Sequence, residues 1–271
     1  MFELKKNFKG LYNYLVGGYK ILSNWPTFFL ELIRVKSGLK TKCTLYKLRD
    51  GTKLRLHANS TGLNFVFYEV FLKRVYDKLP EFSIKSDDIV IDIGAHLGFF
   101  TIMASKIASQ GTVYAFEPFS KHYNLLKDNI EQNGIKNVKY YNEAVYDKKG
   151  ELNFYYTLDG DPTNTSIYNI DKKNNVYSEK INSTSLSEFF LREKITKCNF
   201  MKIDCEGAEY SILMQSDDTT LNKIQKIAME WHRFNDEHDP KKLSNFLKEK
   251  GFQVIEPQDY KKTSGLLFAY R

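Results

Sequence analysis

Apolar segments of strand length alternate with amphipathic segments from residue 88 onward, and this alternation constrains the fold more than any other feature of the chain. The first segment, Ile89-Val90-Ile91-Asp92-Ile93, is almost continuously apolar, as is typical of a parallel strand covered by helices on both faces. The pattern predicts an α/β fold with a doubly wound, Rossmann-like sheet, in which ligands bind at the carboxyl ends of the strands. Further strands are expected over 112–116, 138–145, 200–203, 226–230, 252–255 and 266–270, helices over 99–109, 121–133, 186–192 and 240–250, and an extra edge strand over 150–156.

The chain before residue 88 shows helical periodicity and one hairpin signature, the latter around Asp50-Gly51. We therefore expect two units, a basic N-terminal extension of helices and a hairpin over 1–60 and an α/β domain over 61–271. In the extension and the segment that follows it, helices are expected over 2–22, 27–35 and 63–79, and the hairpin over 42–57.

The net charge of +7 is concentrated in one part of the chain. Residues 1–50 carry ten basic and three acidic side chains, whereas the remaining 221 residues carry 30 of each sign. A uniformly basic nucleic-acid-binding protein is therefore not expected. An aromatic content of 15% also excludes a disordered chain.

The cysteine content and the hydropathy of the chain indicate a cytoplasmic protein. The three cysteines, Cys43, Cys198 and Cys205, form no disulfide framework and no metal-ligand spacing. No apolar run reaches the roughly 18 residues that a membrane span needs, and the N-terminus lacks the features of a secretory signal. Contact with a membrane is expected only at its surface, through the basic N-terminal segment.

The first strand ends in a glycine turn that is suited to a ligand. Asp92 is followed by Gly94, Ala95, His96 and Gly98, and a helix begins directly afterwards. Glycines allow the backbone to approach a ligand closely, but the spacing is G-x-x-x-G and not the G-x-G-x-x-G of dinucleotide-binding proteins. An acid two residues before the first glycine favours a cationic cofactor, so we predict S-adenosylmethionine rather than NAD. The alternative is a tight turn without a ligand.

The next two strands also end in polar residues. Glu117, followed by Pro118, ends the second strand, where an acid is able to bind both ribose hydroxyls of either cofactor. Asn142, Glu143 and Ala144 lie at the end of the third strand, where the adenine is expected. A solvated side chain is the alternative for both Glu117 and Glu143.

Three carboxylates surround a second glycine turn, at the end of the strand expected over 200–203. Asp204, Glu206 and Glu209 are so close in sequence that they need a cation, a donor or a shared proton. His232 ends the next strand and is a candidate general base oriented by Asp204 or Glu206. The alternatives are a capping role for Glu209 and a structural role for His232. A divalent metal at these acids is conceivable but not predicted.

Four stretches together resemble the FkbM-type S-adenosylmethionine-dependent methyltransferases, a family within the class I methyltransferases. The most specific is Lys202-Ile203-Asp204-Cys205-Glu206-Gly207-Ala208-Glu209, and the others cover 90–100, 116–118 and 230–232. The resemblance extends over 64–271, and residues 1–60 fall outside the shared motifs. It implies a seven-stranded, mostly parallel sheet with an antiparallel last strand. It also implies O-methylation of a hydroxyl on a sugar, glycan or natural product, with S-adenosylhomocysteine as product.

The resemblance also assigns roles to individual residues. Glu69 matches an acid of the family that helps to close the cofactor site. His96 stands where the family commonly has asparagine, which preserves the backbone role of the loop and leaves the role of the side chain open. Apart from the resemblance, we predict that Asp204 binds beside the reactive end of the cofactor and, with Glu206 and His232, orients and deprotonates the acceptor. The polar loop over 159–175 is a candidate lid.

Two other classes of function remain alternatives at this point, and the basic segment suggests a partner. The classes are an NAD-dependent oxidoreductase and a catalytically inactive adaptor that docks on a membrane or a protein. We predict that the N-terminal segment recognises an anionic phospholipid surface or a lipid-linked or phosphate-bearing acceptor. The alternative for this segment is a solvated helix face that covers the core.

Overall fold

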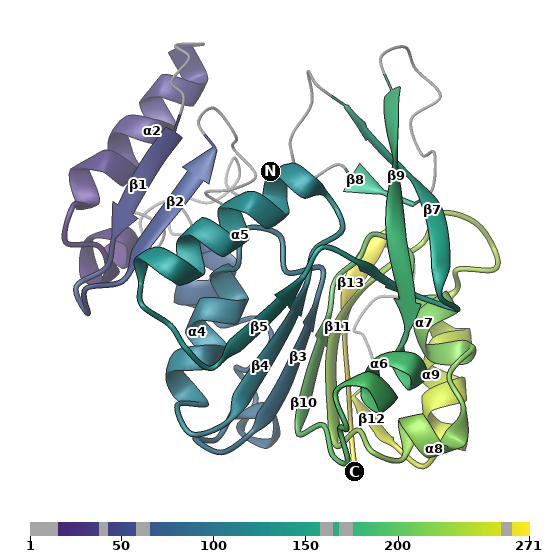
Figure 1. Cartoon of the computed structure of the whole chain (residues 1–271). Helices are drawn as coiled ribbons and strands as arrows, with labels where there is room; N and C mark the ends of the chain where they lie inside the picture. The colour runs from purple at the N-terminus through teal and green to yellow at the C-terminus, as the bar shows by residue number, and fades with distance from the viewer. Residues whose placement is uncertain (1–15, 38–42, 58–65, 158–164, 168–175, 256–261) are drawn as a thin grey trace.

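The structure is a computed structural model, and it describes residues 16–37, 43–57, 66–157, 165–167, 176–255 and 262–271. A seven-stranded sheet in the order β12-β13-β11-β10-β3-β4-β5 forms the centre (Figure 1). The neighbours from β11 to β5 are parallel, and β13 is antiparallel to both β11 and β12, which confirms the predicted fold class and the antiparallel last strand. The strands are β3 (Ile89–Ile93), β4 (Thr112–Phe116), β5 (Val138–Tyr141), β10 (Phe200–Ile203), β11 (Lys226–His232), β12 (Gln253–Ile255) and β13 (Ser264–Tyr270).

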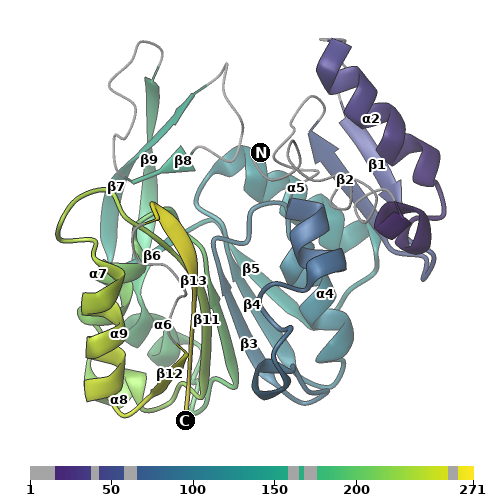
Figure 2. The same ribbon diagram turned by 180° about the vertical axis from the view of Figure 1, so that it is seen from behind.

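Helices cover both faces of this sheet (Figures 1 and 2). Val90 and Ile91, neighbours in β3, belong to two different buried clusters, one on each face. This two-sided burial explains why the strands are apolar at almost every position. The helices are α4 (Phe99–Ile107) and α5 (Ser120–Gln132) on one face, and α6 (Leu186–Arg192), α7 (Glu209–Met214), α8 (Asp218–Leu221) and α9 (Pro240–Glu249) on the other.

The N-terminal segment packs on the main domain. The predicted hairpin is present as β1 (Cys43–Lys47) and β2 (Lys53–His57), and α2 (Trp25–Ser37) precedes it. The hairpin is joined to α5 because the backbone N–H of Arg55 donates to Asn129 Oδ1 at 2.7 Å. Apolar side chains of α2 and the hairpin lie in the same buried cluster as one face of the sheet. Of the helix expected over 2–22, residues 16–21 are helical and the first fifteen residues lie outside the described part.

Two segments differ from expectation. The predicted strand over 138–145 breaks after Tyr141, and β6 (Ala144–Tyr146) leaves the main sheet for a second, four-stranded sheet in the order β6-β9-β7-β8. The segment expected as an extra edge strand pairs there with β9, which the sequence analysis did not identify. Of the candidate lid over 159–175, only 165–167 are described. The other strands of this sheet are β7 (Gly150–Thr157), β8 (Thr165–Ser166) and β9 (Val176–Ser185).

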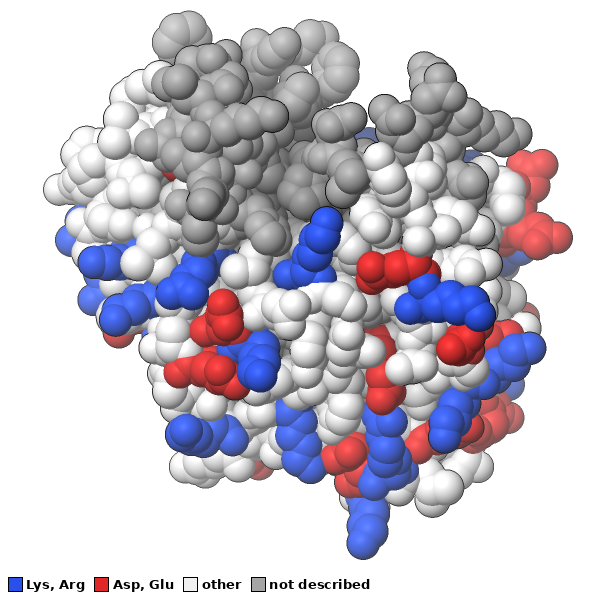
Figure 3. All heavy atoms as spheres, turned by 45° about the horizontal axis from the view of Figure 1, so that its top comes forward, with Lys and Arg blue, Asp and Glu red and all other residues white. Residues whose placement is uncertain are grey.

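The segment before β3 is also shorter and less regular than the helix predicted over 63–79. Within its described part, residues 66–79, the π-helix η1 covers Tyr68–Lys73 and is followed by Arg74 in a left-handed conformation with φ 52°. A short 3-10 helix, η2 (Pro80–Phe82), follows. On the outer surface shown in Figure 3, acidic and basic side chains are interspersed over the described residues, in agreement with the balanced charge of the main domain.

Candidate active site

The glycine turn after β3 is in direct contact with the end of β10. Gly94 has φ +77°, and a Cβ at this position would lie 1.8 Å from the carbonyl oxygen of Asp204. Gly98 has φ +82°, and a Cβ there would lie 2.4 Å from Leu126 Cδ1. The positive φ favours glycine at both positions, and at Gly94 the backbone of Asp204 also leaves no room for a side chain. Ala95, between them, is buried.

The acid of this turn is neutralised from within the chain. Asp92 is completely buried, accepts a hydrogen bond from Thr101 Oγ1 at 2.6 Å, and has the ammonium of Lys202 at 3.3 Å. Burial raises the pKa of Asp92, and the charge of Lys202 opposes that shift. The cation that faces Asp92 in this structure is thus a side chain, whereas the sequence analysis reserved this place for the cofactor.

Lys202 connects the two halves of the site. Its Nζ donates to the carbonyl of Gly94 at 2.8 Å and lies 3.7 Å from Asp204 Oδ2, in addition to its contact with Asp92. Burial lowers the pKa of Lys202, but the charges of Asp92 and Asp204 outweigh this effect and raise it. Lys202 belongs to the most specific sequence motif, but no role was predicted for it. A lysine flanked by apolar residues in a buried strand was the available signal.

Glu117 anchors the glycine turn to the end of β4. It is buried, and its two carboxylate oxygens accept the backbone N–H groups of His96 at 2.8 Å and Phe119 at 3.0 Å. His96 has φ 53°, and its ring lies edge-on to His122 with the centroids 4.3 Å apart. The backbone of His96, as the sequence analysis expected, therefore takes part in the turn. A ribose-binding role for Glu117 stays a prediction.

The residues predicted around the adenine lie close to the same strand end. Asn142 Nδ2 donates to the carbonyls of Glu117 and Pro118, at 2.9 and 2.8 Å. Glu143 is directed to α6, where it forms an ion pair with Arg192 at 3.1 Å. Ala144 is buried in a small cluster of apolar side chains. Contacts of these residues with adenine stay predictions.

The loop after β10 carries Asp204, Glu206 and Glu209 and is called the acid loop here. Hydrogen bonds connect it to neighbouring segments. Tyr76 Oη donates to Asp204 Oδ2 at 2.9 Å, and burial together with the charge of Asp204 raises the pKa of Tyr76 far above its usual range. Glu206 has φ 51°, and its backbone carbonyl accepts a hydrogen bond from Ser166 Oγ at 2.8 Å. The described part of the candidate lid is therefore attached to the acid loop. Glu209, for which a capping role was an alternative, is completely buried at the start of α7.

His232 is surrounded by carboxylates. Its Nδ1 lies 2.6 Å from Glu209 Oε1, and its Nε2 lies 3.5 Å from Glu206 Oε2 and 4.0 Å from Glu230 Oε1. Burial lowers the pKa of His232, but the hydrogen bond to Glu209 and the neighbouring charges outweigh burial and raise it to about 10. His232 is therefore an imidazolium near neutral pH, and both of its ring nitrogens are hydrogen-bond donors. This differs from the expectation that His232 acts as a general base, and the reason is the surrounding negative charge.

Three further carboxylic acids of the cluster have pKa values above their usual range. Burial raises the pKa of Glu206 to about 8, and burial and the charge of Asp204 raise those of Glu69 and Glu230 to about 7. Glu69 thus lies within electrostatic reach of Asp204, and its role in closing the cofactor site stays a prediction. Glu230 has no role in the sequence analysis, although it stands at the end of β11. The cluster holds more carboxylates than cations, so it favours a positively charged ligand.

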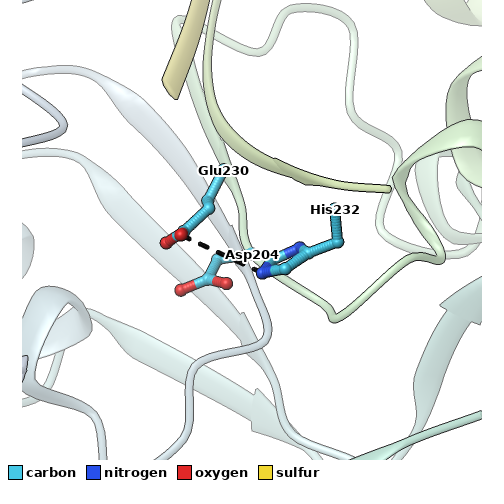
Figure 4. A group of neighbouring side chains, drawn as sticks. All are labelled: Asp204, Glu230 and His232. Carbon is cyan, nitrogen blue, oxygen red and sulfur yellow. Dashed lines mark ion pairs between the residues drawn. The ribbon is translucent and has the colours of Figure 1, made fainter. Parts of the chain in front are cut away.

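The described residues contain one group with the geometry to hold a metal. Single ligand atoms of Asp204, Glu230 and His232 lie within 4.8 Å of one another (Figure 4). Nδ1 of His232 is bonded to Glu209, so only Nε2 is available, and it must first lose its proton. A cationic organic ligand needs no such deprotonation, and the absence of a metal stays our prediction.

The stability of the folded chain is expected to decrease as the pH rises from about 5 to about 10. Glu69, Glu206 and Glu230 have folded-state pKa values above their unfolded value of 4.5, and His232 has one above 6.5. Each group therefore binds its proton more tightly in the folded state, and its contribution is present at low pH and lost as pH rises. Melting temperatures should show a shallower decrease between pH 5 and 8 for Glu206→Gln than for wild type.

Exposed Glu151, replaced by glutamine, is the control for this pH series. Its profile should follow that of the wild type. Superposition of the Glu206→Gln profile on the wild-type profile would contradict the assignment.

Comparison with known proteins identifies the family. The family model described as "Methyltransferase FkbM domain" matches residues 92–254. The chain belongs to the FkbM methyltransferase family. The FkbM match begins at Asp92 and ends in β12, so it contains the glycine turn, Glu117 and the acid loop. It leaves out Glu69 and the N-terminal segment.

Several known proteins are similar to this chain. The chain is 25% identical over 218 residues to Methyltransferase 1 of Beauveria bassiana, with 73% of this chain and 84% of that protein covered. It is 23% identical over 228 residues to the 31-O-demethyl-FK506 methyltransferase FkbM of Streptomyces tacrolimicus, with 75% and 86% covered. The solved FkbM methyltransferase of Methylobacillus flagellatus KT has 14% identity and a TM-score of 0.49. That alignment covers 78% of this chain and about half, 52%, of the other. None of the described helices of this FkbM-family member has both the length and the apolarity that crossing a bilayer requires.

Proposed function

We propose that the chain is an S-adenosylmethionine-dependent O-methyltransferase that acts on a hydroxyl of a sugar, glycan or natural product. One observation carries the proposal: a surplus of carboxylates lies at the ends of β10 and β11, against the glycine turn of β3. The turn leaves no room for a side chain at Gly94, and the surplus suits a sulfonium or an α-ammonium group. The residues present therefore fit this cofactor better than they fit a pyrophosphate.

The residues divide into a cofactor side and an acceptor side. We assign the methionine end to the turn that contains Gly94 and Gly98, the ribose to Glu117, and the adenine to the strand end with Glu143 and Ala144. Lys202 fixes the position of the turn relative to the acceptor side, because it contacts both Gly94 and Asp204. Asp92, which is buried behind the turn, supports it through Lys202 and does not itself reach the surface.

When bound, S-adenosylmethionine supplies a methyl group on a positively charged sulfur, which leaves as a neutral thioether with the electron pair of the broken C–S bond. The acceptor oxygen forms the new bond to this carbon and loses its proton. We assign that proton to Asp204, which Tyr76 orients through its hydroxyl. His232 and Glu206 then position the acceptor, since the imidazolium of His232 is a donor.

A thermal-shift comparison tests the cofactor. A ligand at 100 times its dissociation constant stabilises a protein by about 2.7 kcal/mol, so excess S-adenosylhomocysteine should raise the melting temperature by roughly 5 °C or more. NAD⁺ should leave it unchanged. A shift with NAD⁺ alone would favour the oxidoreductase alternative. The inactive-adaptor alternative would instead bind S-adenosylhomocysteine and transfer no labelled methyl group to any member of a panel of hydroxylated glycans and natural products.

A further inference from the structure

Helix α2 exposes four large apolar side chains to solvent, although Phe28 of the same helix is buried in the core. Trp25, Phe29, Leu30 and Ile33 are 42%, 44%, 54% and 49% exposed, whereas the acid Glu31 is buried on the side that faces the protein. At 3.6 residues per turn, the four exposed side chains span roughly 140° of the helix surface. A surface helix of a soluble protein normally presents mostly polar and charged residues on the side that faces water.

Tyr19 extends this surface beyond the helix. It is 54% exposed, and its ring packs edge-on against Trp25 with the centroids 5.7 Å apart. Five of the nine exposed large apolar side chains in the described part of the chain lie within residues 19–33. We call these five the α2 patch: Tyr19, Trp25, Phe29, Leu30 and Ile33. The other four are scattered over β9, α6, α7 and β12.

Basic side chains adjoin the α2 patch. The guanidinium of Arg49 lies 5.4 Å from the ring centroid of Tyr19 and donates to the Tyr19 carbonyl at 2.9 Å. Lys20, next to Tyr19, and Lys47, in β1, are exposed. The whole excess charge of the protein, +7, lies within residues 1–50. The occupant of the patch should therefore offer both an apolar phase and negative charge.

We propose that the α2 patch docks the protein on the surface of an anionic phospholipid bilayer. Tryptophan and tyrosine are the residues that settle at the boundary between headgroups and acyl chains, and leucine, isoleucine and phenylalanine enter the apolar layer. Lysine and arginine beside them are attracted to anionic headgroups. A second copy of the chain would bring the same positive charge to the contact, which disfavours self-association.

The position of α2 relates this surface to the active site. In both ribbon views, α2 and the β7–β9 sheet stand at the end of the molecule toward which the parallel strands point (Figures 1 and 2). The glycine turn and the acid loop follow those strand ends. Docking through α2 therefore brings the membrane to the end of the protein that carries the candidate active site.

Co-sedimentation of the full chain with vesicles tests the proposal. Wild type should bind vesicles of phosphatidylcholine and phosphatidylglycerol (3:1) and bind pure phosphatidylcholine vesicles more weakly. Replacing two side chains of the patch, as Phe29→Ser with Ile33→Ser, should weaken binding by on the order of tenfold or more. Added salt should weaken wild-type binding to the anionic vesicles.

Leu191→Ser is the matched control, because Leu191 is 80% exposed on α6, away from the patch. It should bind vesicles like wild type, and all variants should keep the same thermal shift with S-adenosylhomocysteine. That shift keeps failure of docking distinct from failure of the proposed activity. Equal vesicle binding by wild type and the double variant, or no binding by either, overturns the proposal. So does a concentration-dependent dimer that the double variant abolishes, since the patch would then be a protein contact.

Discussion

Asp204→Asn is expected to reduce methyl transfer by roughly 10²- to 10⁴-fold, the usual contribution of a general base. Asparagine keeps the shape of the side chain and accepts the hydrogen bond from Tyr76, but it cannot take a proton. Glu206 is a poor substitute near neutral pH, because its pKa of about 8 leaves it mostly protonated. Transfer of a labelled methyl group to the best acceptor from the panel, at saturating cofactor, measures the effect.

Binding of S-adenosylhomocysteine by Asp204→Asn should stay close to that of the wild type, so that the loss falls on turnover. Asp87→Asn, an exposed acid in the turn before β3, is the control and should retain full activity. Near wild-type turnover of Asp204→Asn would remove Asp204 from the reaction. The same assay in EDTA should show no loss; a loss restored by Mg²⁺ would assign Asp204, Glu230 and His232 to a metal instead.

Lys202→Met should lower the free energy of unfolding by about 3–5 kcal/mol, since it leaves a buried charge without a partner. Asp92 is completely buried, and the ammonium of Lys202 lies 3.3 Å from it. Without Lys202, Asp92 would keep only the hydrogen bond from Thr101, which is a neutral donor and cannot balance the charge. The double variant Lys202→Met with Asp92→Asn should recover much of this loss, because neither charge remains. Urea unfolding with a constant m-value measures both changes.

The pH dependence separates this explanation from simple loss of packing. Burial already raises the pKa of Asp92, and loss of Lys202 should raise it further, so acid neutralises the stranded group. The destabilisation of Lys202→Met should therefore be smaller at pH 5 than at pH 8. Lys139→Met, at an exposed strand lysine paired with Glu193, should cost no more than about 1 kcal/mol. Equal losses for the two lysine variants would contradict the buried-pair account.

The sheet was predictable from sequence because its strands are buried on both faces. Each apolar run is followed by a polar residue, as at Glu117 and Asp204. Hydrophobic periodicity and continuous apolar runs are local properties of the chain, so they can be recognised without knowledge of long-range contacts. β9 was missed because seven of its ten residues are polar or charged, and its pairing with β7 depends on a partner across a polar loop.

Part of the cluster around Asp204 was predictable from the motifs, but its charge states were not, and no role was predicted for Lys202, Tyr76 or Glu230. The motifs identified Asp92, Asp204 and His232 as residue types that belong together. Which of them carries a proton depends on contacts over long separations in sequence, such as Lys202 to Gly94 and Tyr76 to Asp204. Burial of Glu209 against His232 converts a candidate base into a cation, and no local pattern announces that burial.

The π-helix η1 sets the spacing between Glu69 and Tyr76, two residues near the acid loop. A π-helical turn closes its hydrogen bonds from residue i to residue i+5 and therefore holds more residues than an α-helical turn. Glu69 lies inside η1, and Tyr76 follows three residues after it ends. Deleting one residue between them would shift Tyr76 relative to Glu69 and should disturb the hydrogen bond from Tyr76 to Asp204. A relative with a one-residue gap here would keep both side chains in its sequence and lose their present spacing relative to Asp204.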